Sequence, residues 1–111
     1  MFEEMSIGSY QHKAGRTRAH GERNVELSNY ALGLVCEAGE VGDILKKVIY
    51  HGHNLDEHEI KKEIGDVLWY LANLCSVLGY NLEDIAQINL EKLYKRYPNG
   101  FNTNDSINRI D

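Results

Sequence analysis

Four acidic residues form two closely spaced pairs in the middle of the 111-residue chain. Glu37 and Glu40 are three positions apart, as are Glu63 and Asp66. On an α-helix this spacing places both side chains of a pair on the same face. Carboxylate oxygens are the ligands that the hard cation Mg²⁺ prefers, with Mn²⁺ as a substitute. Two such faces brought together would form a site for divalent cations.

Two long helices are needed to position these pairs. The apolar residues of segment 24–50 recur at spacings of three and four, which predicts an amphipathic helix. Segment 57–78 shows the same pattern, with Asp56 as the expected N-cap and Gly79 as the stop signal. Because the loop over 51–56 is short, the two helices are expected to be antiparallel. The acidic pairs would then face each other.

Glu37 lies on the apolar side of the first of these helices. At 3.6 residues per turn, Leu34 and Val41 fall within about 60° of Glu37 around the helix axis. The alternative is a solvated acidic face paired with nearby lysines. That alternative explains Glu37 and Glu63 badly, because an unpaired buried carboxylate is costly. Divalent cations held between the helices would remove this cost and the repulsion between the pairs.

The rest of the chain also indicates an all-α protein, because Pro98 is the single proline and stands near the end. A short helix is expected over about 8–18, and a further one over 82–96 with Asn81 as its cap. Segment 97–100 should end that helix, and the polar tail over 102–111 is expected to be frayed. Short connections favour an antiparallel bundle. The apolar residues of the last helix that should face inward are Ile85, Ile88 and Leu93.

Composition limits the classes of function. The chain has 12 Lys+Arg against 17 Asp+Glu, a net charge of −5, and its length predicts one domain. This acidic excess disfavours nucleic acid polymers and anionic membranes as partners. No secretory signal or membrane span is recognisable, so a cytoplasmic location is expected. Cys36 and Cys75 are too few for a disulfide framework and are expected to be buried thiols.

Three glycines interrupt the helix expected over 24–50. Gly33, Gly39 and Gly42 each cost up to ~1 kcal/mol relative to alanine inside a helix. Their presence implies that another backbone approaches closely or that the helix is kinked.

The acidic pairs and their surroundings resemble the ExxE…ExxD signature of the MazG-like, all-α NTP pyrophosphohydrolases. Two stretches of sequence carry the similarity, LGLVCEAGEV around Glu37 and EIGDVLWYL around Asp66. Residues 41–62 separate the two acidic pairs. The later segment 89–101 is also similar to the family, and the resemblance extends over about 10–101. It implies a helical bundle of this superfamily's type, completed by oligomerisation. The single helical domain would span 1–101, followed by the polar C-terminal tail 102–111.

The resemblance also implies an activity. Members of this family hydrolyse nucleoside triphosphates between the α and β phosphates, giving the monophosphate and pyrophosphate. They use Mg²⁺, for which Mn²⁺ can substitute, and form homodimers or dimer-of-dimers tetramers. A house-cleaning role toward dNTPs or aberrant nucleotides would fit. The alternatives are a phosphoribosyl-ATP pyrophosphatase and a non-catalytic helical dimerisation module, and the intact acidic pairs argue against the module.

Within this hypothesis the four carboxylates have distinct roles. Glu37, Glu40, Glu63 and Asp66 are candidate metal ligands, and Glu37 or Glu40 is the candidate general base. The sequence does not choose between these two glutamates. No Ser-His-Asp or Cys-His grouping is recognisable, so direct attack by water is expected rather than a covalent intermediate.

Four further residues are candidates for substrate binding. Tyr70 and Asn73 lie on the acidic side of their helix, although hydrogen bonding between helices would also explain them. Lys95 and Arg96 could bind phosphate, but cations at a helix C-terminus also complement the helix dipole. The N-terminal pairs Tyr10-Gln11 and Arg16-Thr17 resemble a segment common in these proteins that could form a lid or contact the base. For Trp69, a core or interface role is preferred over stacking on a base.

Overall fold

The structure is a computed structural model and describes residues 4–110. Within this range the chain is entirely helical apart from turns and loops, which confirms the all-α prediction. The elements are α1 (Ile7–Ala14), the 3₁₀ turn η1 (Gly15–Thr17), α2 (Arg23–Tyr50), α3 (Glu57–Leu78), α4 (Leu82–Arg96) and α5 (Thr103–Ile107).

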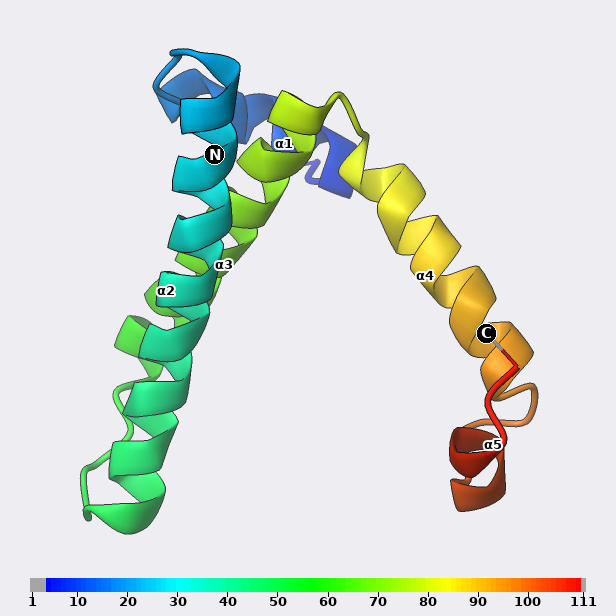
Figure 1. Cartoon of the computed structure of the whole chain (residues 1–111). Helices are drawn as coiled ribbons and strands as arrows, with labels where there is room; N and C mark the ends of the chain where they lie inside the picture. Colours follow the sequence, from blue (N-terminus) through cyan, green and yellow to red (C-terminus); the bar gives the residue numbers. More distant parts are fainter. Residues whose placement is uncertain (1–3, 111) are drawn as a thin grey trace.

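The long helices α2 and α3 form an antiparallel pair (Figure 1). Local signals set the bounds of α3, as predicted. Asp56 Oδ1 accepts hydrogen bonds from the backbone N–H groups of His58 and Glu59, both at 3.1 Å. At the other end Gly79 has φ 80°, a left-handed conformation that glycine adopts at little cost. The 28 residues of α2 and 22 of α3 thus provide two long facing surfaces.

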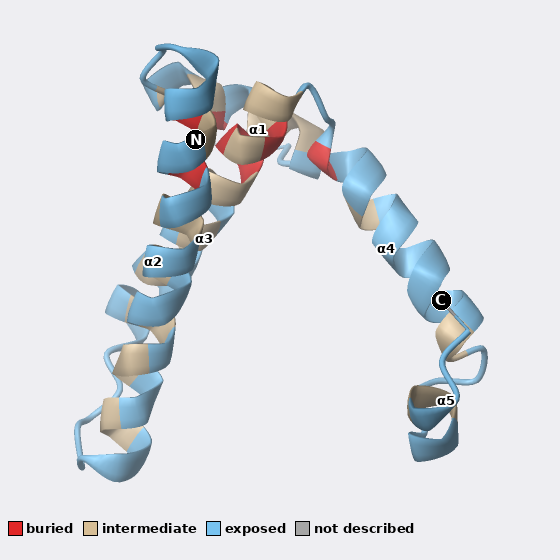
Figure 2. Ribbon diagram, viewed as in Figure 1, coloured by how far each residue is buried: buried red, intermediate tan, exposed pale blue. Residues whose placement is uncertain are grey.

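The core lies at one end of this helix pair, where α1 crosses it. Ala14, Ala72, Cys75 and Leu82 form a buried cluster contributed by α1, α3 and the start of α4. Buried residues gather at this end, whereas the other end of the pair is mostly half-buried or exposed (Figure 2). The end with α1 is therefore the part of the molecule where the chain itself excludes water.

Helix α4 does not pack along the other helices, and the expectation that it would lie antiparallel beside α3 was wrong. α4 contacts α1 at its beginning and then projects away from the α2–α3 pair (Figure 1). The residues expected to face inward, Ile85, Ile88 and Leu93, are 37%, 64% and 36% exposed. They are exposed because no other helix within residues 4–110 covers this face of α4.

Two other expectations were also wrong. Cys36 is exposed, although Cys75 is buried as predicted. Cys36 lies on α2, whose main packing partner within residues 4–110 is α3, so side chains away from α3 meet solvent. The tail expected to be frayed contains α5, where Asn102 Oδ1 accepts a hydrogen bond of 2.8 Å from the backbone N–H of Asp105. This N-cap holds a short helix in place.

None of the helices in residues 4–110 combines the length and the apolar character that crossing a bilayer requires.

Candidate active site

The structure brings three of the four predicted carboxylates together. Glu37 extends from α2, and Glu63 and Asp66 extend from α3. One oxygen from each of the three lies within 4.8 Å of the others. Glu37 and Glu63 are half-buried and Asp66 is exposed, so the group is open to solvent on one side. We call these three residues the carboxylate triad.

The surroundings of Glu37 disfavour its charged form. The pKa of Glu37 is raised, first by a hydrogen bond with the side chain of Glu63. Burial and the negative charges of Asp66, Glu63 and Glu40 raise the pKa further. Each of these effects favours a protonated Glu37 in the absence of a cation. A divalent cation would replace that proton, and three carboxylates are a donor set that Mg²⁺ accepts.

Nearby lysines pair with other acids. Lys47 and Lys46 contact Asp43 at 2.7 and 3.4 Å, and Asp43 lies nearly two turns beyond Glu37 on α2. Lys62 contacts Glu59 at 2.8 Å. The solvated ion pairs considered as an alternative from the sequence therefore exist, but they involve acids outside the triad.

Glu40 is set apart from the triad. It is exposed and lies outside the group of oxygens within 4.8 Å, yet its charge contributes to the raised pKa of Glu37. Glu40 is thus close enough to act electrostatically on the site without facing α3 directly. The predicted set of four carboxylates divides into three facing residues and one peripheral residue.

Tyr70 lies about one helical turn beyond Asp66 on α3 and closely contacts α2. A Cβ added to Gly33 would overlap its ring, with Cζ at 2.6 Å. The ring also stands 6.2 Å from that of Tyr30 and 5.0 Å from that of Trp69, between centroids. Of the three glycines in α2, Gly33 alone makes such an approach, because Gly39 and Gly42 have no atom within 4 Å of an added Cβ in residues 4–110. The approaching group is a side chain rather than the backbone that was expected.

Asn73 is completely buried and connects α3 to α1. Its Nδ2 donates to the carbonyls of Trp69 and Ala14, at 3.1 and 3.4 Å. Its Oδ1 has no partner in the described structure. The indole N–H of Trp69 donates to Thr17 Oγ1 at 2.9 Å, so both residues hold the N-terminal segment. The interhelical hydrogen bonding considered for Asn73 is present.

The charge of the triad acts on one residue of the N-terminal segment. Tyr10 on α1 packs against the buried cluster. Burial, and secondly the negative charge of Asp66, raise the pKa of Tyr10. The role of the N-terminal segment as a lid or a contact for the base stays a prediction.

Lys95 and Arg96 lie far from the triad within one chain. They end α4, which has diverged from α2 and α3 by that point (Figure 1). The structure of one chain therefore does not bring these two cations to the carboxylates.

One buried acid near the site was missed by the sequence reasoning. Glu26 is 9% exposed and pairs with Arg18 Nε at 3.1 Å. Glu26 stands 11 residues before Glu37, about three helical turns, so it shares the face toward α3. That spacing could have indicated burial, but Arg18 lies in a loop whose path the sequence did not define. The pair holds the loop before α2 and has no position in the triad.

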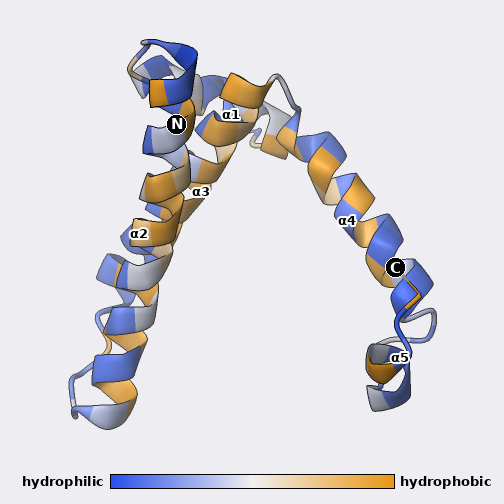
Figure 3. Cartoon of the chain, in the orientation of Figure 1, coloured by the Kyte–Doolittle hydropathy of each residue, from blue (hydrophilic) through white to orange (hydrophobic). Residues whose placement is uncertain are grey.

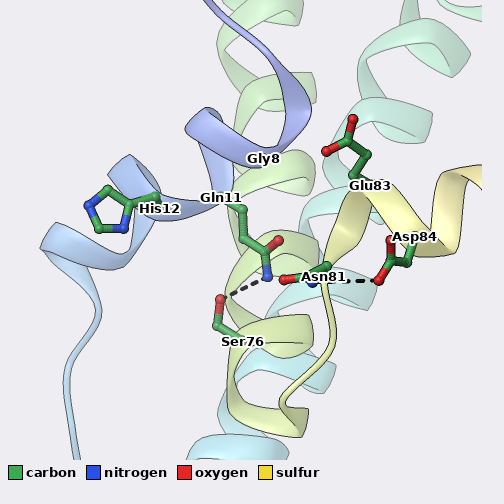
Figure 4. Close-up of a pocket in the computed structure, with 7 residues that line it drawn as sticks. All are labelled: Gly8, Gln11, His12, Ser76, Asn81, Glu83 and Asp84. Carbon is green, nitrogen blue, oxygen red and sulfur yellow. Dashed lines mark hydrogen bonds between the residues drawn. The ribbon is translucent and has the colours of Figure 1, made fainter.

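A polar cavity of ≈ 400 Å³ lies where α1, α3 and α4 meet (Figure 4). Gln11 closes one side of it. Gln11 Nε2 donates to Ser76 Oγ at 3.0 Å and to the carbonyl of Tyr80 at 2.9 Å. Gln11 Oε1 accepts from the backbone N–H of Leu82 at 2.8 Å. This amide thus fixes the start of α4, and none of the predicted carboxylates or substrate-binding residues lines the cavity.

Comparison with known proteins agrees with this arrangement. Residues 26–101 match the MazG nucleotide pyrophosphohydrolase domain. The chain belongs to the MazG nucleotide pyrophosphohydrolase family, and both acidic pairs lie within the matched region. It is 34% identical over 87 residues to the Gene 37 protein of Mycobacterium phage L5, covering 75% of this chain and 76% of the phage protein. No solved structure gave a significant match.

Proposed function

We propose that the chain is a Mg²⁺-dependent nucleoside triphosphate pyrophosphohydrolase, cleaving (d)NTPs between the α and β phosphates to (d)NMP and pyrophosphate. One observation supports this most strongly. Glu37, Glu63 and Asp66 come from both acidic motifs and offer oxygens within 4.8 Å of one another. An acidic site accepts a polyanionic substrate only if cations neutralise the charge between them.

Each carboxylate has a role in this proposal. Glu37, Glu63 and Asp66 would hold Mg²⁺, or Mn²⁺ in its place, with Glu40 completing the set from its exposed position. The cation supplies charge neutralisation at the phosphates when it is bound. Glu37 or Glu40 would accept the proton from the attacking water, because Glu37 belongs to the triad and the charge of Glu40 acts on it. Water would attack the α-phosphorus directly, and pyrophosphate would leave.

Substrate contacts are assigned to residues around the triad. Tyr70 borders the triad, and its hydroxyl group could donate to a phosphate or sugar oxygen. Asn73 is buried, so we propose that it orients the helix that holds Asp66 rather than touching a large substrate. Lys95 and Arg96 are assigned to phosphate binding, which requires a second chain because they are distant from the triad in their own.

We propose that this second chain is another copy, in a homodimer or a dimer of dimers. The Cα radius of gyration is 17.1 Å, whereas a compact domain of this length has about 13 Å. Hydrophobic residues recur along α2 and α4 (Figure 3), and many of their side chains are exposed. Among them are Ile88 at 64%, Leu32 at 63% and Val35 at 69%. Apolar exposure of this extent marks an interaction surface.

The cellular role is part of the same proposal. We propose a house-cleaning role in the cytoplasm, in which the protein removes dNTPs or aberrant nucleotides by hydrolysis. The alternatives remain a phosphoribosyl-ATP pyrophosphatase and a non-catalytic helical dimerisation module, and no observation in the structure favours either.

The deciding experiment is a panel of NTPs, dNTPs and phosphoribosyl-ATP, assayed for pyrophosphate release with Mg²⁺ and with EDTA. We expect release from nucleoside triphosphates with Mg²⁺ and none with EDTA. Release of single phosphates instead of pyrophosphate would contradict the assigned bond. No release from any substrate would favour the non-catalytic module.

A further inference from the structure

Gly33 of α2 lies directly against the ring of Tyr70 on α3. A methyl group on Gly33 would overlap the ring of Tyr70 at Cδ1, Cε1 and Cζ. The ring therefore occupies the space that any other residue at position 33 would need. A glycine in the middle of a 28-residue helix costs up to ~1 kcal/mol, so its presence calls for a reason of this kind.

The position of this contact relates it to the triad. Gly33 precedes Glu37 by four residues on α2, and Tyr70 follows Asp66 by four residues on α3. Residues four apart on a helix are neighbours on one face. Because α2 and α3 are antiparallel, the ring of Tyr70 lies one turn from the triad on both helices. The distance between the helices at the ring then determines their distance at the carboxylates.

Other aromatic rings hold Tyr70 in place. Tyr30 is 1% exposed, and its hydroxyl group donates to the carbonyl of Ala19 at 3.2 Å. The ring of Tyr30 packs at 52° to that of Tyr70, and the ring of Trp69 packs at 90°. Close packing of this kind leaves little room for the Tyr70 ring to move aside.

We propose that Gly33 and Tyr70 act as a spacer that sets the separation of α2 and α3 at which the triad can bind a divalent cation. The inference rests on the proposed function, because it concerns the same cation site. Tyr70 is then a positioning residue through its ring, independently of any contact that its hydroxyl group makes with substrate. Ligand atoms must be held to within about 0.5 Å for a metal site to bind well, and a methyl group in this contact exceeds that tolerance.

The test measures Mn²⁺ affinity by electron paramagnetic resonance on the full chain without nucleotide. Gly33→Ala should bind Mn²⁺ about 10-fold more weakly or worse, the range seen when residues that orient metal ligands are changed. Gly42→Ala is the matched control, because it adds the same methyl group to α2 where nothing lies within 4 Å. Gly42→Ala should keep the wild-type affinity. Sedimentation of both variants checks that assembly is unchanged.

Variants at Tyr70 separate the ring from the hydroxyl group. Tyr70→Phe keeps the ring and should keep the Mn²⁺ affinity. The double variant Gly33→Ala/Tyr70→Leu makes room for the methyl group and should bind Mn²⁺ more tightly than Gly33→Ala alone. If Gly33→Ala does not fold, Tyr70→Leu alone should still weaken Mn²⁺ binding, because the spacer is removed.

The outcomes distinguish this inference from the proposed function. If Gly33→Ala binds Mn²⁺ with wild-type affinity, the spacer is refuted and the proposed function is unaffected. The same holds for wild-type Mn²⁺ affinity in Tyr70→Leu if Gly33→Ala is unfolded. Weaker binding in both Gly33→Ala and Gly42→Ala also overturns it, because the effect would not depend on Tyr70. Wild-type protein that binds no Mn²⁺ overturns the preformed cation site and the spacer together, while pyrophosphate release with Mg²⁺ would still support the activity.

Discussion

The carboxyl groups of Glu37 and Glu63 meet across α2 and α3 closely enough to share a hydrogen bond. Two carboxyl groups share a hydrogen bond only when one of them carries a proton, and a cation bound between them would take the place of that proton. The structure thus joins the two acidic motifs at one point, and we predict that this point responds to pH and to divalent metal ions.

The first prediction concerns the stability of the metal-free protein as a function of pH. The raised pKa of Glu37, due first to its hydrogen bond with Glu63, means that the folded protein binds a proton more tightly than the unfolded chain does. Its stability should therefore fall as pH rises from about 4.3, the ordinary glutamate value, to the raised pKa. Urea unfolding in EDTA across this range measures the effect.

Glu37→Gln is the control for this prediction, because glutamine does not titrate. The free energy of unfolding of the wild type, minus that of the variant, should decrease with rising pH. A difference that stays constant or increases would show that Glu37 is not held in a repulsive site.

The second prediction concerns turnover. Glu40→Gln and Asp66→Asn should lower pyrophosphate release by at least about 100-fold, because a proton acceptor or a metal ligand is lost. The fold should persist, since each change is isosteric and removes a negative charge from a crowded acidic group. Circular dichroism checks the fold beside the activity assay. Full activity in both variants would refute the site of four carboxylates.

The third prediction concerns stabilisation by metal. A ligand that binds only the folded state stabilises it by about 2.7 kcal/mol at a free concentration 100 times its Kd. For a domain of this size each 1 kcal/mol raises the Tm by roughly 4–8 °C. Saturating Mg²⁺ or Mn²⁺ should therefore raise the Tm of the wild type. The rise should disappear in Glu37→Gln/Glu63→Gln, and an unchanged wild-type melting curve would argue against a preformed site.

The elements that local signals define were predictable from the sequence. The bounds of α3 followed from Asp56 and Gly79, whose effects on the backbone extend over a few residues only. The grouping of Glu37 with Glu63 and Asp66 was predictable for a related reason. Helical spacing and a short loop are enough to bring these residues to one interface.

Features that depend on long-range contacts were not predictable. The direction of α4 depends on Gln11, which bonds to the backbone of Leu82 from 71 residues away. The contact of Gly33 with Tyr70 depends on the register of α2 against α3, which periodicity leaves undefined. The exposure of Ile88 depends on whether another chain covers α4, which the pattern of one sequence does not state.

The last prediction tests whether two chains share one site. In a single chain the triad and the end of α4 are far apart, so a phosphate-binding Arg96 must act on the triad of another copy. An Asp66→Asn chain and an Arg96→Ala chain should each be inactive alone. After mixing and subunit exchange, each heterodimer contains one complete site. The Arg96→Ala chain supplies the intact triad of that site, and the Asp66→Asn chain supplies the intact Arg96. Up to half of the wild-type activity per heterodimer should therefore return. Mixing Asp66→Asn with Glu63→Gln is the control, because both changes fall in the triad and no intact site can form. Recovery in the control, or a stable and active monomer of 12.7 kDa in sedimentation, would contradict a shared site.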